Sequence, residues 1–206
     1  MTRQSRLHAC QLAAAAAAAA LAIAGCSGGA IGQSTPFSSG QSFVSGTGDT
    51  LYKPGAGPVA PDIAGTTLAG AHLSLSAYRG SVIVLNFWGS WCGPCRAEAP
   101  DLAAVARQFR SRGVRFLGID IRDDTTNAEA FMQTYQISYP SLNDPDASLA
   151  LAFRETVPPT AIPTTLVIDS TGRIAARVLG SVSYDSLKAI LVRVLAERGT
   201  AAGKSR

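Results

Sequence analysis

The chain has 206 residues, enough for one domain of ordinary size with terminal extensions. Hydrophobic residues make up 47% of it, so a substantial core can form. The formal net charge is only +4, and no cluster of Lys and Arg alternates with aromatic residues, which argues against a nucleic-acid-binding surface.

The N-terminus is typical of a secretory signal. Arg3 and Arg6 precede an alanine-rich apolar stretch, Leu12 to Ile23, which is shorter than the about 20 residues that a membrane span needs. The stretch leads into Ile-Ala-Gly-Cys, which resembles a bacterial lipobox. We therefore expect residues 1–25 to be a lipoprotein signal peptide and lipidated Cys26 to anchor the protein at the extracytoplasmic face of the bacterial cell membrane. A plain cleavable signal with an incidental cysteine is the alternative.

Residues 26–58 are rich in Gly, Ser, Thr and Pro. Such a composition buries too little surface to offset its ordering entropy, so it predicts a flexible tether, with a structured extension as the alternative. We expect the folded domain to span residues 59–198 and a disordered tail to span residues 199–206.

Apolar periodicity predicts the elements of the domain. The β-branched run Val82–Trp88 is typical of a central strand buried on both faces. The expected elements begin with an extended segment within 60–68 and a helical turn at 74–80. In chain order there follow a strand at 82–88, a helix at 98–112, a strand at 114–121, helices at 125–135 and 144–153, strands at 164–169 and 174–179, and a helix from 183 onward. This order predicts an α/β fold in which a parallel strand pair is followed by an antiparallel hairpin.

The four cysteines are Cys10, Cys26, Cys92 and Cys95. Cys10 would leave with the signal and Cys26 would carry lipid. Only Cys92 and Cys95 would then remain, in a compartment that permits disulfides. The pair is therefore the predicted site of redox chemistry.

A metal site is a weak alternative for this cysteine pair. Zinc needs about four ligands, and the only histidines are His8, in the predicted signal, and His72, which we expect at the surface. Asp120, Asp123 and Asp124 suggest a cation site, but a solvated loop after a strand is the simpler interpretation. We expect no metal and no cofactor.

The position of the dithiol favours thiol chemistry. Cys92 follows a predicted strand and opens a predicted helix, where free N–H groups and the helix dipole stabilise a thiolate. Cys92 is therefore the expected nucleophile, and Cys95, one turn further on, the expected resolving thiol. Pro94 suits the first turn of a helix, and Gly93 allows the turn before it to stay tight.

The stretch Val84–Arg96, VLNFWGSWCGPCR, resembles the active-site strand and helix start of the thioredoxin superfamily. It is most similar to the extracytoplasmic TlpA/ResA-like branch, because Asn86 replaces the buried Asp of cytoplasmic thioredoxins and because Glu98 and Pro100 follow the dithiol. The resemblance covers about Val59 to Arg198. It implies a thioredoxin-like fold, with a mixed central sheet flanked by helices, an N-terminal extension and a central insertion.

The resemblance also implies a role for Glu98. As a partly buried carboxylate on the helix face of Cys95, it would move a proton during exchange and is a candidate catalytic residue. The alternative is a solvated acid favoured by the helix dipole. We expect Asn86 to be a buried polar filler and Trp88 to lie in the core.

The expected substrate-binding surface comprises Trp91, Gly93, Pro94, Ile162 and Pro163. In the thioredoxin family a cis-proline faces the dithiol, which implies a cis Ile162–Pro163 bond. The backbone of Ile162 would pair with a substrate chain, and Pro163 would keep metals from the thiols. Trp91 is expected to be an exposed contact.

The expected function is thiol–disulfide exchange on exported proteins, as a reductase. The resemblance implies apocytochrome c thiols, in cytochrome c maturation, as a candidate substrate and a membrane thiol transporter of the CcdA/DsbD type as the electron donor. Oxidation of secreted thiols is the alternative. A thiol peroxidase and a redox-inert binding lipoprotein are further alternatives, against which the intact Trp-Cys-Gly-Pro-Cys sequence argues.

Overall fold

The computed structural model of the chain describes residues 43–44, 49–158 and 161–204. All described residues belong to one compact unit, Gly40–Arg206. The predicted signal peptide and Cys26 lie outside the described residues. Within the described residues, no helix combines the length and the apolar character needed to cross a bilayer.

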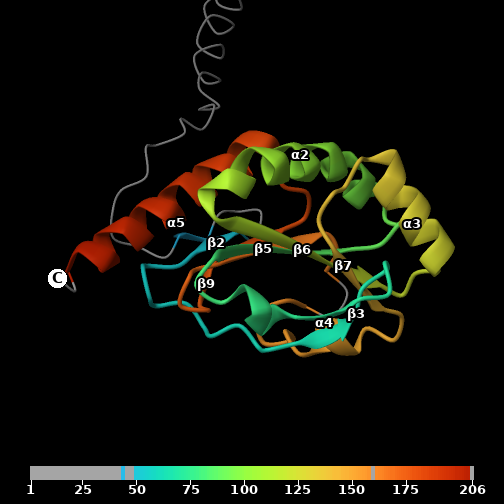
Figure 1. The fold of residues 1–206 in the computed structure, drawn as a ribbon, viewed down its shortest axis with the longest axis horizontal. Helices are drawn as coiled ribbons and strands as arrows, with labels where there is room; N and C mark the ends of the chain where they lie inside the picture. Colours follow the sequence, from blue (N-terminus) through green and yellow to red (C-terminus); the bar gives the residue numbers. More distant parts are fainter. Residues whose placement is uncertain (1–42, 45–48, 159–160, 205–206) are drawn as a thin grey trace, which may run out of the picture. The chain divides into compact units, whose positions relative to one another are not determined.

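A seven-stranded mixed sheet forms the centre of the domain, in the order β1-β2-β9-β8-β5-β6-β7 (Figure 1). Its strands are β1 (Phe43–Val44), β2 (Thr50–Leu51), β5 (Val82–Trp88), β6 (Val114–Ile121), β7 (Ser141–Asp144), β8 (Thr164–Ile168) and β9 (Ile174–Leu179). Strands β5, β6 and β7 run parallel, whereas β8 and β9 form an antiparallel hairpin beside β5. The predicted parallel pair and hairpin are thus confirmed.

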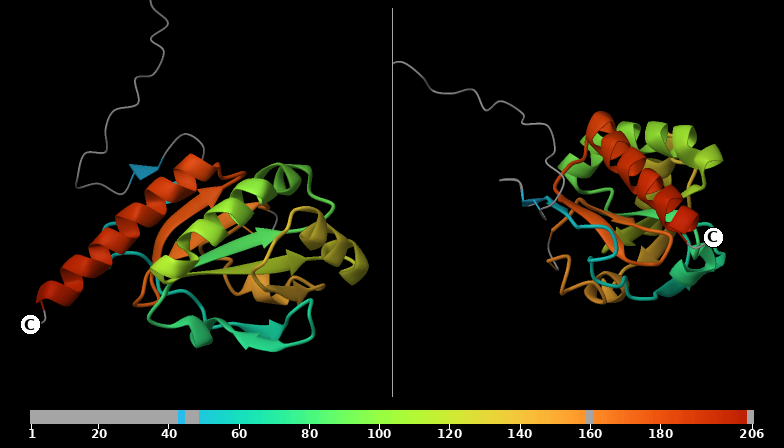
Figure 2. Two further views of the ribbon diagram at one scale, coloured as in Figure 1. Left: turned by 45° about the horizontal axis from the view of Figure 1, so that its top comes forward. Right: turned by 90° about the vertical axis from the view of Figure 1, so that its left-hand side faces the viewer.

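Two layers cover the sheet (Figures 1 and 2). Helices α2 (Gly93–Phe109), α3 (Thr125–Thr134) and α5 (Tyr184–Lys204) pack on one face. The other face carries the hairpin of β3 (Ala64–Thr66) and β4 (His72–Ser74), the 3₁₀ turn η1 (Leu75–Tyr78) and the short helix α4 (Ser148–Leu151). The second 3₁₀ turn, η2 (Arg110–Arg112), follows α2. This arrangement is the thioredoxin-like α/β fold that the sequence predicts.

Strand β5 is central because both of its faces are apolar. Val82 and Val84 point to the helical layer, and Ile83, Leu85 and Phe87 point to the opposite layer. All residues of β5 are buried, as expected for a strand with neighbours on both sides and layers on both faces. The strand is therefore a rigid base for the loop that follows it.

Strand β7 was not predicted. Its sequence, Ser-Leu-Asn-Asp, contains a single strongly apolar residue, Leu142, which is fully buried and pairs with Ile119. The strand exists because its backbone completes the sheet beside β6. The helix predicted at 144–153 is correspondingly short and occupies only Ser148–Leu151, because residues before it belong to the strand and its turn.

The domain begins earlier than the predicted boundary at residue 59. Thr50 is buried and pairs with Arg177 of β9, and the N–H of Ile174 donates to the carbonyl of Pro58 (2.9 Å). The described part of the predicted tether is therefore attached to the sheet. Backbone pairing at a sheet edge needs no apolar pattern, so composition did not reveal it.

The C-terminal end also extends beyond the prediction. Helix α5 continues to Lys204, whereas a disordered tail was expected from residue 199.

Candidate active site

The loop after β5 brings the two cysteines together at the start of α2. Cys92 caps the helix: its Sγ accepts a hydrogen bond from the N–H of Cys95 (3.2 Å). The two residues form a disulfide, with Cα atoms 5.3 Å apart. Cys92 is 5% exposed and Cys95 only 1%, so the first cysteine is the more accessible. This is the arrangement expected for an attacking and a resolving thiol.

Exposed residues surround Cys92 at the surface. Trp91 is 55% exposed, as predicted, and Gly93 and Pro94 are exposed beside it. Trp88, at the end of β5, is buried and stacks on Phe131 of α3 (ring centroids 4.5 Å apart), as expected for a core residue. Three residues of the predicted contact surface are thus exposed next to Cys92, whereas Ile162 is half-buried and Pro163 is buried.

The segment before β8 faces the disulfide from the other side. The Ile162–Pro163 peptide bond is cis, as the resemblance implied. Ile162 is half-buried and packs against the apolar cluster that contains Cys92 and Cys95. The fold therefore brings the predicted proline segment and the dithiol together from distant parts of the sequence.

Glu98 lies on α2, three residues after Cys95, and is only 2% exposed. Its Oε1 accepts a hydrogen bond from Asn86 Nδ2 (2.8 Å), and its Oε2 accepts one from the Val182 N–H (2.8 Å). Burial raises the pKa of Glu98 to about 7, against the opposing effect of these two hydrogen bonds. The carboxyl group can therefore gain or lose a proton near neutral pH.

Asn86 has a more specific role in the structure than a buried filler. Its Nδ2 donates to Glu98 and also to Thr165 Oγ1 (3.1 Å), the residue opposite it on β8. The amide therefore orients the carboxyl group and links it to the sheet. The prediction of burial was right, but it missed these hydrogen bonds.

The loop between β9 and α5 supports the site with three successive residues. The Gly180 N–H donates to the carbonyl of Pro163 (2.9 Å). Ser181 Oγ donates to the carbonyl of Pro94 (3.0 Å). Val182 follows with its hydrogen bond to the buried carboxylate. The residue types of this loop did not predict its role, because two of its three donors are backbone N–H groups.

The loop after β6 supports the opposite side of the dithiol. Asp123 accepts hydrogen bonds from the N–H and the Oγ of Ser90. The Trp91 Nε1–H donates to the carbonyl of Arg122 (3.1 Å), and Arg96 Nε donates to the carbonyl of Ser90 (2.8 Å). Two loops from different strands thus hold the active-site loop.

Asp120 contradicts the prediction of a solvated acidic loop. Its side chain is fully buried at the end of β6, beside Trp88 of β5, and neither carboxyl oxygen has a hydrogen-bond partner among the described residues. Burial, together with the negative charges of Asp123 and Asp144, raises the pKa of Asp120 to about 8. The other two acids fit the predicted solvated loop better. Asp123 is half-buried, and Asp124 is exposed and caps α3.

The part of the chain that the structure describes contains no group of three or more His, Cys, Asp or Glu side chains placed to hold a metal ion. His72 is exposed on β4, as predicted. The chemistry available at the site is that of two thiols, a buried carboxyl group and a surface for a polypeptide substrate.

Comparison with known proteins supports this chemistry. Residues 56–177, more than half of the chain, match the AhpC/TSA family. The thiol–disulfide oxidoreductase ResA of Geobacillus thermodenitrificans is 30% identical over 132 residues, which cover 64% of this chain and 74% of the relative.

Solved structures of thiol–disulfide exchange proteins are also similar to this chain. A secreted thiol–disulfide isomerase from Corynebacterium glutamicum is 32% identical, with a TM-score of 0.69, over 76% of this chain and 98% of that protein. A DsbF homologue from Corynebacterium diphtheriae is 33% identical, with a TM-score of 0.67, over 74% of this chain and 98% of that protein. The chain therefore belongs to the AhpC/TSA family and is a thiol–disulfide oxidoreductase with a thioredoxin-like fold.

Proposed function

We propose that the Cys92–Cys95 pair reduces disulfides of exported proteins, with Glu98 as the proton acceptor. The placement of this pair supports the proposal: it sits at the N-terminus of α2, and the same helix carries, three residues after Cys95, a buried carboxyl group whose pKa is about 7. Cys92 is 5% exposed between exposed neighbours, whereas Cys95 is only 1% exposed.

The first step is attack of the Cys92 thiolate on a substrate disulfide. A bond forms between Cys92 Sγ and one substrate sulfur, and the substrate S–S bond breaks, so that the second substrate sulfur leaves as a thiolate. The N-terminus of α2 favours the attacking thiolate electrostatically. Trp91 and Ile162 are the candidate contacts for the substrate chain on either side of Cys92.

The second step resolves the mixed disulfide. Glu98, in its carboxylate form, accepts the proton of the Cys95 thiol, and the resulting thiolate attacks Cys92 Sγ. A Cys92–Cys95 bond forms, the mixed disulfide breaks, and the substrate sulfur that had bonded to Cys92 leaves as a thiolate. Two electrons have then passed from the dithiol to the substrate, and the pair is left as the disulfide seen in the structure.

The direction of electron flow is the main alternative, since the same steps in reverse would oxidise secreted thiols. The Gly-Pro dipeptide supports reduction, because it matches thioredoxin, whose potential is about −270 mV. Equilibration of the pair with glutathione or dithiothreitol buffers tests this directly. A potential near that of thioredoxin supports a reductase, and one near the about −120 mV of DsbA would reverse the assignment.

Exported substrates and a lipid anchor belong to the same proposal. The signal-like N-terminus and the secreted relative from Corynebacterium glutamicum support export. Apocytochrome c thiols are a candidate substrate, and a membrane thiol transporter of the CcdA/DsbD type is a candidate donor. A Cys26→Ala variant should appear in the soluble fraction while the unchanged chain remains with membranes. Equal membrane retention of both would remove the lipid anchor from the proposal.

Insulin reduction separates the proposed function from the peroxidase and binding alternatives. Cys92→Ser should abolish turnover, whereas Cys95→Ser should accumulate a mixed disulfide with the substrate. Unchanged activity of Cys92→Ser would rule out the dithiol mechanism. Peroxide consumption as fast as disulfide reduction would favour a thiol peroxidase.

A further inference from the structure

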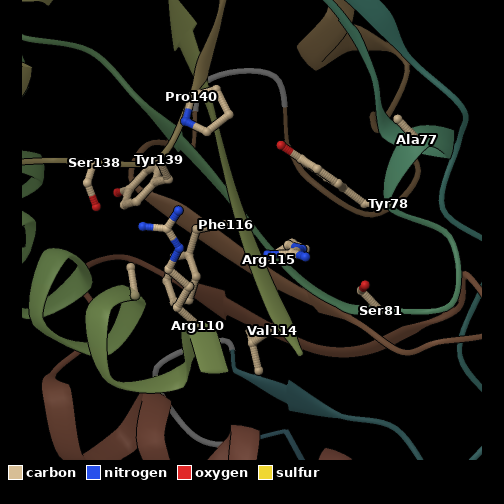
Figure 3. Close-up of a pocket in the computed structure, with 11 residues that line it drawn as sticks. Ala77, Tyr78, Ser81, Arg110, Val114, Arg115, Phe116, Ser138, Tyr139 and Pro140 are labelled. Atoms are coloured by element: carbon tan, nitrogen blue, oxygen red, sulfur yellow. The ribbon is translucent and has the colours of Figure 1, made fainter. Parts of the chain in front are cut away.

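A cavity of about 380 Å³ lies at the end of the sheet that is remote from the dithiol (Figure 3). It surrounds the first residues of β6, whereas the dithiol follows the last residue of the parallel strand β5. Its polar lining comes from Arg110, Arg115, Tyr78, Tyr139, Ser81 and Ser138. None of these residues belongs to the active site described above.

The cavity exposes a free strand edge. β6 pairs with β5 from Val114 onward, but it pairs with β7 only from Gly118 onward. The Gly118 N–H points to the β7 side, where it donates to the carbonyl of Pro140 (2.9 Å). Because backbone groups alternate along a strand, the N–H and C=O of Phe116 point to the same side, where no described strand pairs with them.

The neighbouring edge shows that this opening is local. The outer side of β7 is covered by the chain before β4: the Leu68 N–H donates to the carbonyl of Ser141 (2.9 Å), and Thr67 bridges to Leu142. Among the described residues, the chain before β4 therefore covers β7 at Ser141 and Leu142, whereas no strand pairs with the start of β6 on this side. A free edge of this kind is a template for an added strand.

Two arginines flank the free edge on opposite faces of the sheet. Arg110 follows the end of α2 on the helical face, and Figure 3 shows it beside Tyr139 and Ser138. Arg115 points to the opposite face, which also carries Tyr78. Both arginines are exposed, and neither forms an ion pair with an acid in the described part of the chain.

We propose that this edge binds an extended acidic segment of a protein partner, which adds as a strand beside residues 114–116. Successive side chains of a strand point to opposite faces, so two adjacent carboxylates on that segment would meet Arg110 and Arg115 respectively. The charge complementarity selects an acidic peptide over a basic one. The proposal does not depend on the direction of the redox reaction, because the surface is remote from the dithiol.

Binding of a labelled short peptide tests the proposal on the oxidised protein by fluorescence anisotropy. The probe has two adjacent glutamates flanked by threonine and valine. One control peptide carries lysines in place of the glutamates, and another separates the glutamates by one residue, so that both face the same side. The first peptide should bind at least about threefold more tightly than either control at low salt.

Variants and hydrogen exchange then locate the site. Arg110→Glu and Arg115→Glu should each weaken binding several-fold, whereas Arg107→Glu, an exposed arginine of α2 outside the cavity, should not. Exchange of the Phe116 amide should slow when the peptide binds, because that N–H gains a backbone acceptor. Undetectable binding, equal loss in all three variants, or unchanged Phe116 exchange would overturn the proposal. So would binding of anionic phospholipid vesicles, with the same arginine dependence, in place of the peptide.

Discussion

Asn86 Nδ2 donates a 2.8 Å hydrogen bond to Glu98 Oε1, and this contact joins the central strand β5 to the active-site helix α2. It is one of the two hydrogen bonds that hold the pKa of Glu98 at about 7 rather than higher, because each favours the carboxylate against the effect of burial. The Asn86 amide therefore helps to set the protonation state of the Glu98 carboxyl group.

Glu98→Gln should slow resolution of the mixed disulfide by about 100-fold, a typical contribution of general base catalysis. In the unchanged protein the rate should rise with pH through about 7, because only the carboxylate accepts the Cys95 proton. The variant should lose that inflection. Single-turnover stopped-flow measurements across pH give the comparison, with Glu129→Gln, an exposed acid of α3, as the control. An unmoved inflection would falsify the proton-acceptor role.

Asn86→Leu should raise the pKa of Glu98 above about 7, because a hydrogen bond that favours the carboxylate is lost while burial stays the same. The inflection in the resolution rate should move to higher pH. Stability should fall by about 1–3 kcal/mol, since Glu98 Oε1 and Thr165 Oγ1 lose a buried donor. In the Glu98→Gln background the substitution should no longer affect the pH profile. If it still does, Asn86 acts on another group.

Asp120→Asn should remove a pH-dependent loss of stability. The pKa of this carboxyl group is about 8 in the folded protein and about 3.8 otherwise, so the folded state retains the proton more strongly. Stability should therefore fall as pH rises from about 4 through 8, by roughly 6 kcal/mol at most. Urea unfolding at several pH values should show a flatter profile for Asp120→Asn than for the unchanged protein. Asp124→Asn is the exposed control, and parallel profiles for all three proteins would contradict the prediction.

Trp91→Ala should lower kcat/KM for a protein disulfide by about tenfold and leave reduction of a small aromatic disulfide nearly unchanged. The indole is 55% exposed beside Cys92, so a polypeptide can pack on it while a small reagent needs only the thiol. Stability should change by about 1 kcal/mol or less. Leu151→Ala removes another exposed apolar side chain, 47% exposed and remote from the site, and should leave both rates unchanged. An equal loss of kcat/KM for both substrates would mean that Trp91 affects the reactivity of the dithiol and not the binding of the polypeptide.

Local patterns predicted the parts of this protein that depend on short-range interactions. The β-branched run Val82–Trp88 forms a fully buried strand because its side chains are apolar on both faces. Pro94 and the cysteine spacing predict a helix start, and Cys92 indeed caps α2. The resemblance added the cis bond before Pro163, which no spacing rule would have indicated.

Features that depend on distant segments were not predictable in this way. Strand β7 forms because β6 offers it a backbone partner, and β2 pairs with β9 although it lies in a Gly- and Ser-rich segment. The loop Gly180–Val182 supports the site largely through backbone N–H groups, which every residue except proline carries.

The sequence by itself determined the α/β order of elements, the adjacency of Cys92 and Cys95 at a helix start, and the presence of a carboxyl group one turn later. Only the tertiary structure decided that Glu98 is buried between Asn86 and Val182 and that Asp120 is fully buried. The reason is physical: the pKa of a carboxyl group depends on the solvent and the donors that surround it. Those surroundings are assembled here by residues far apart in the chain.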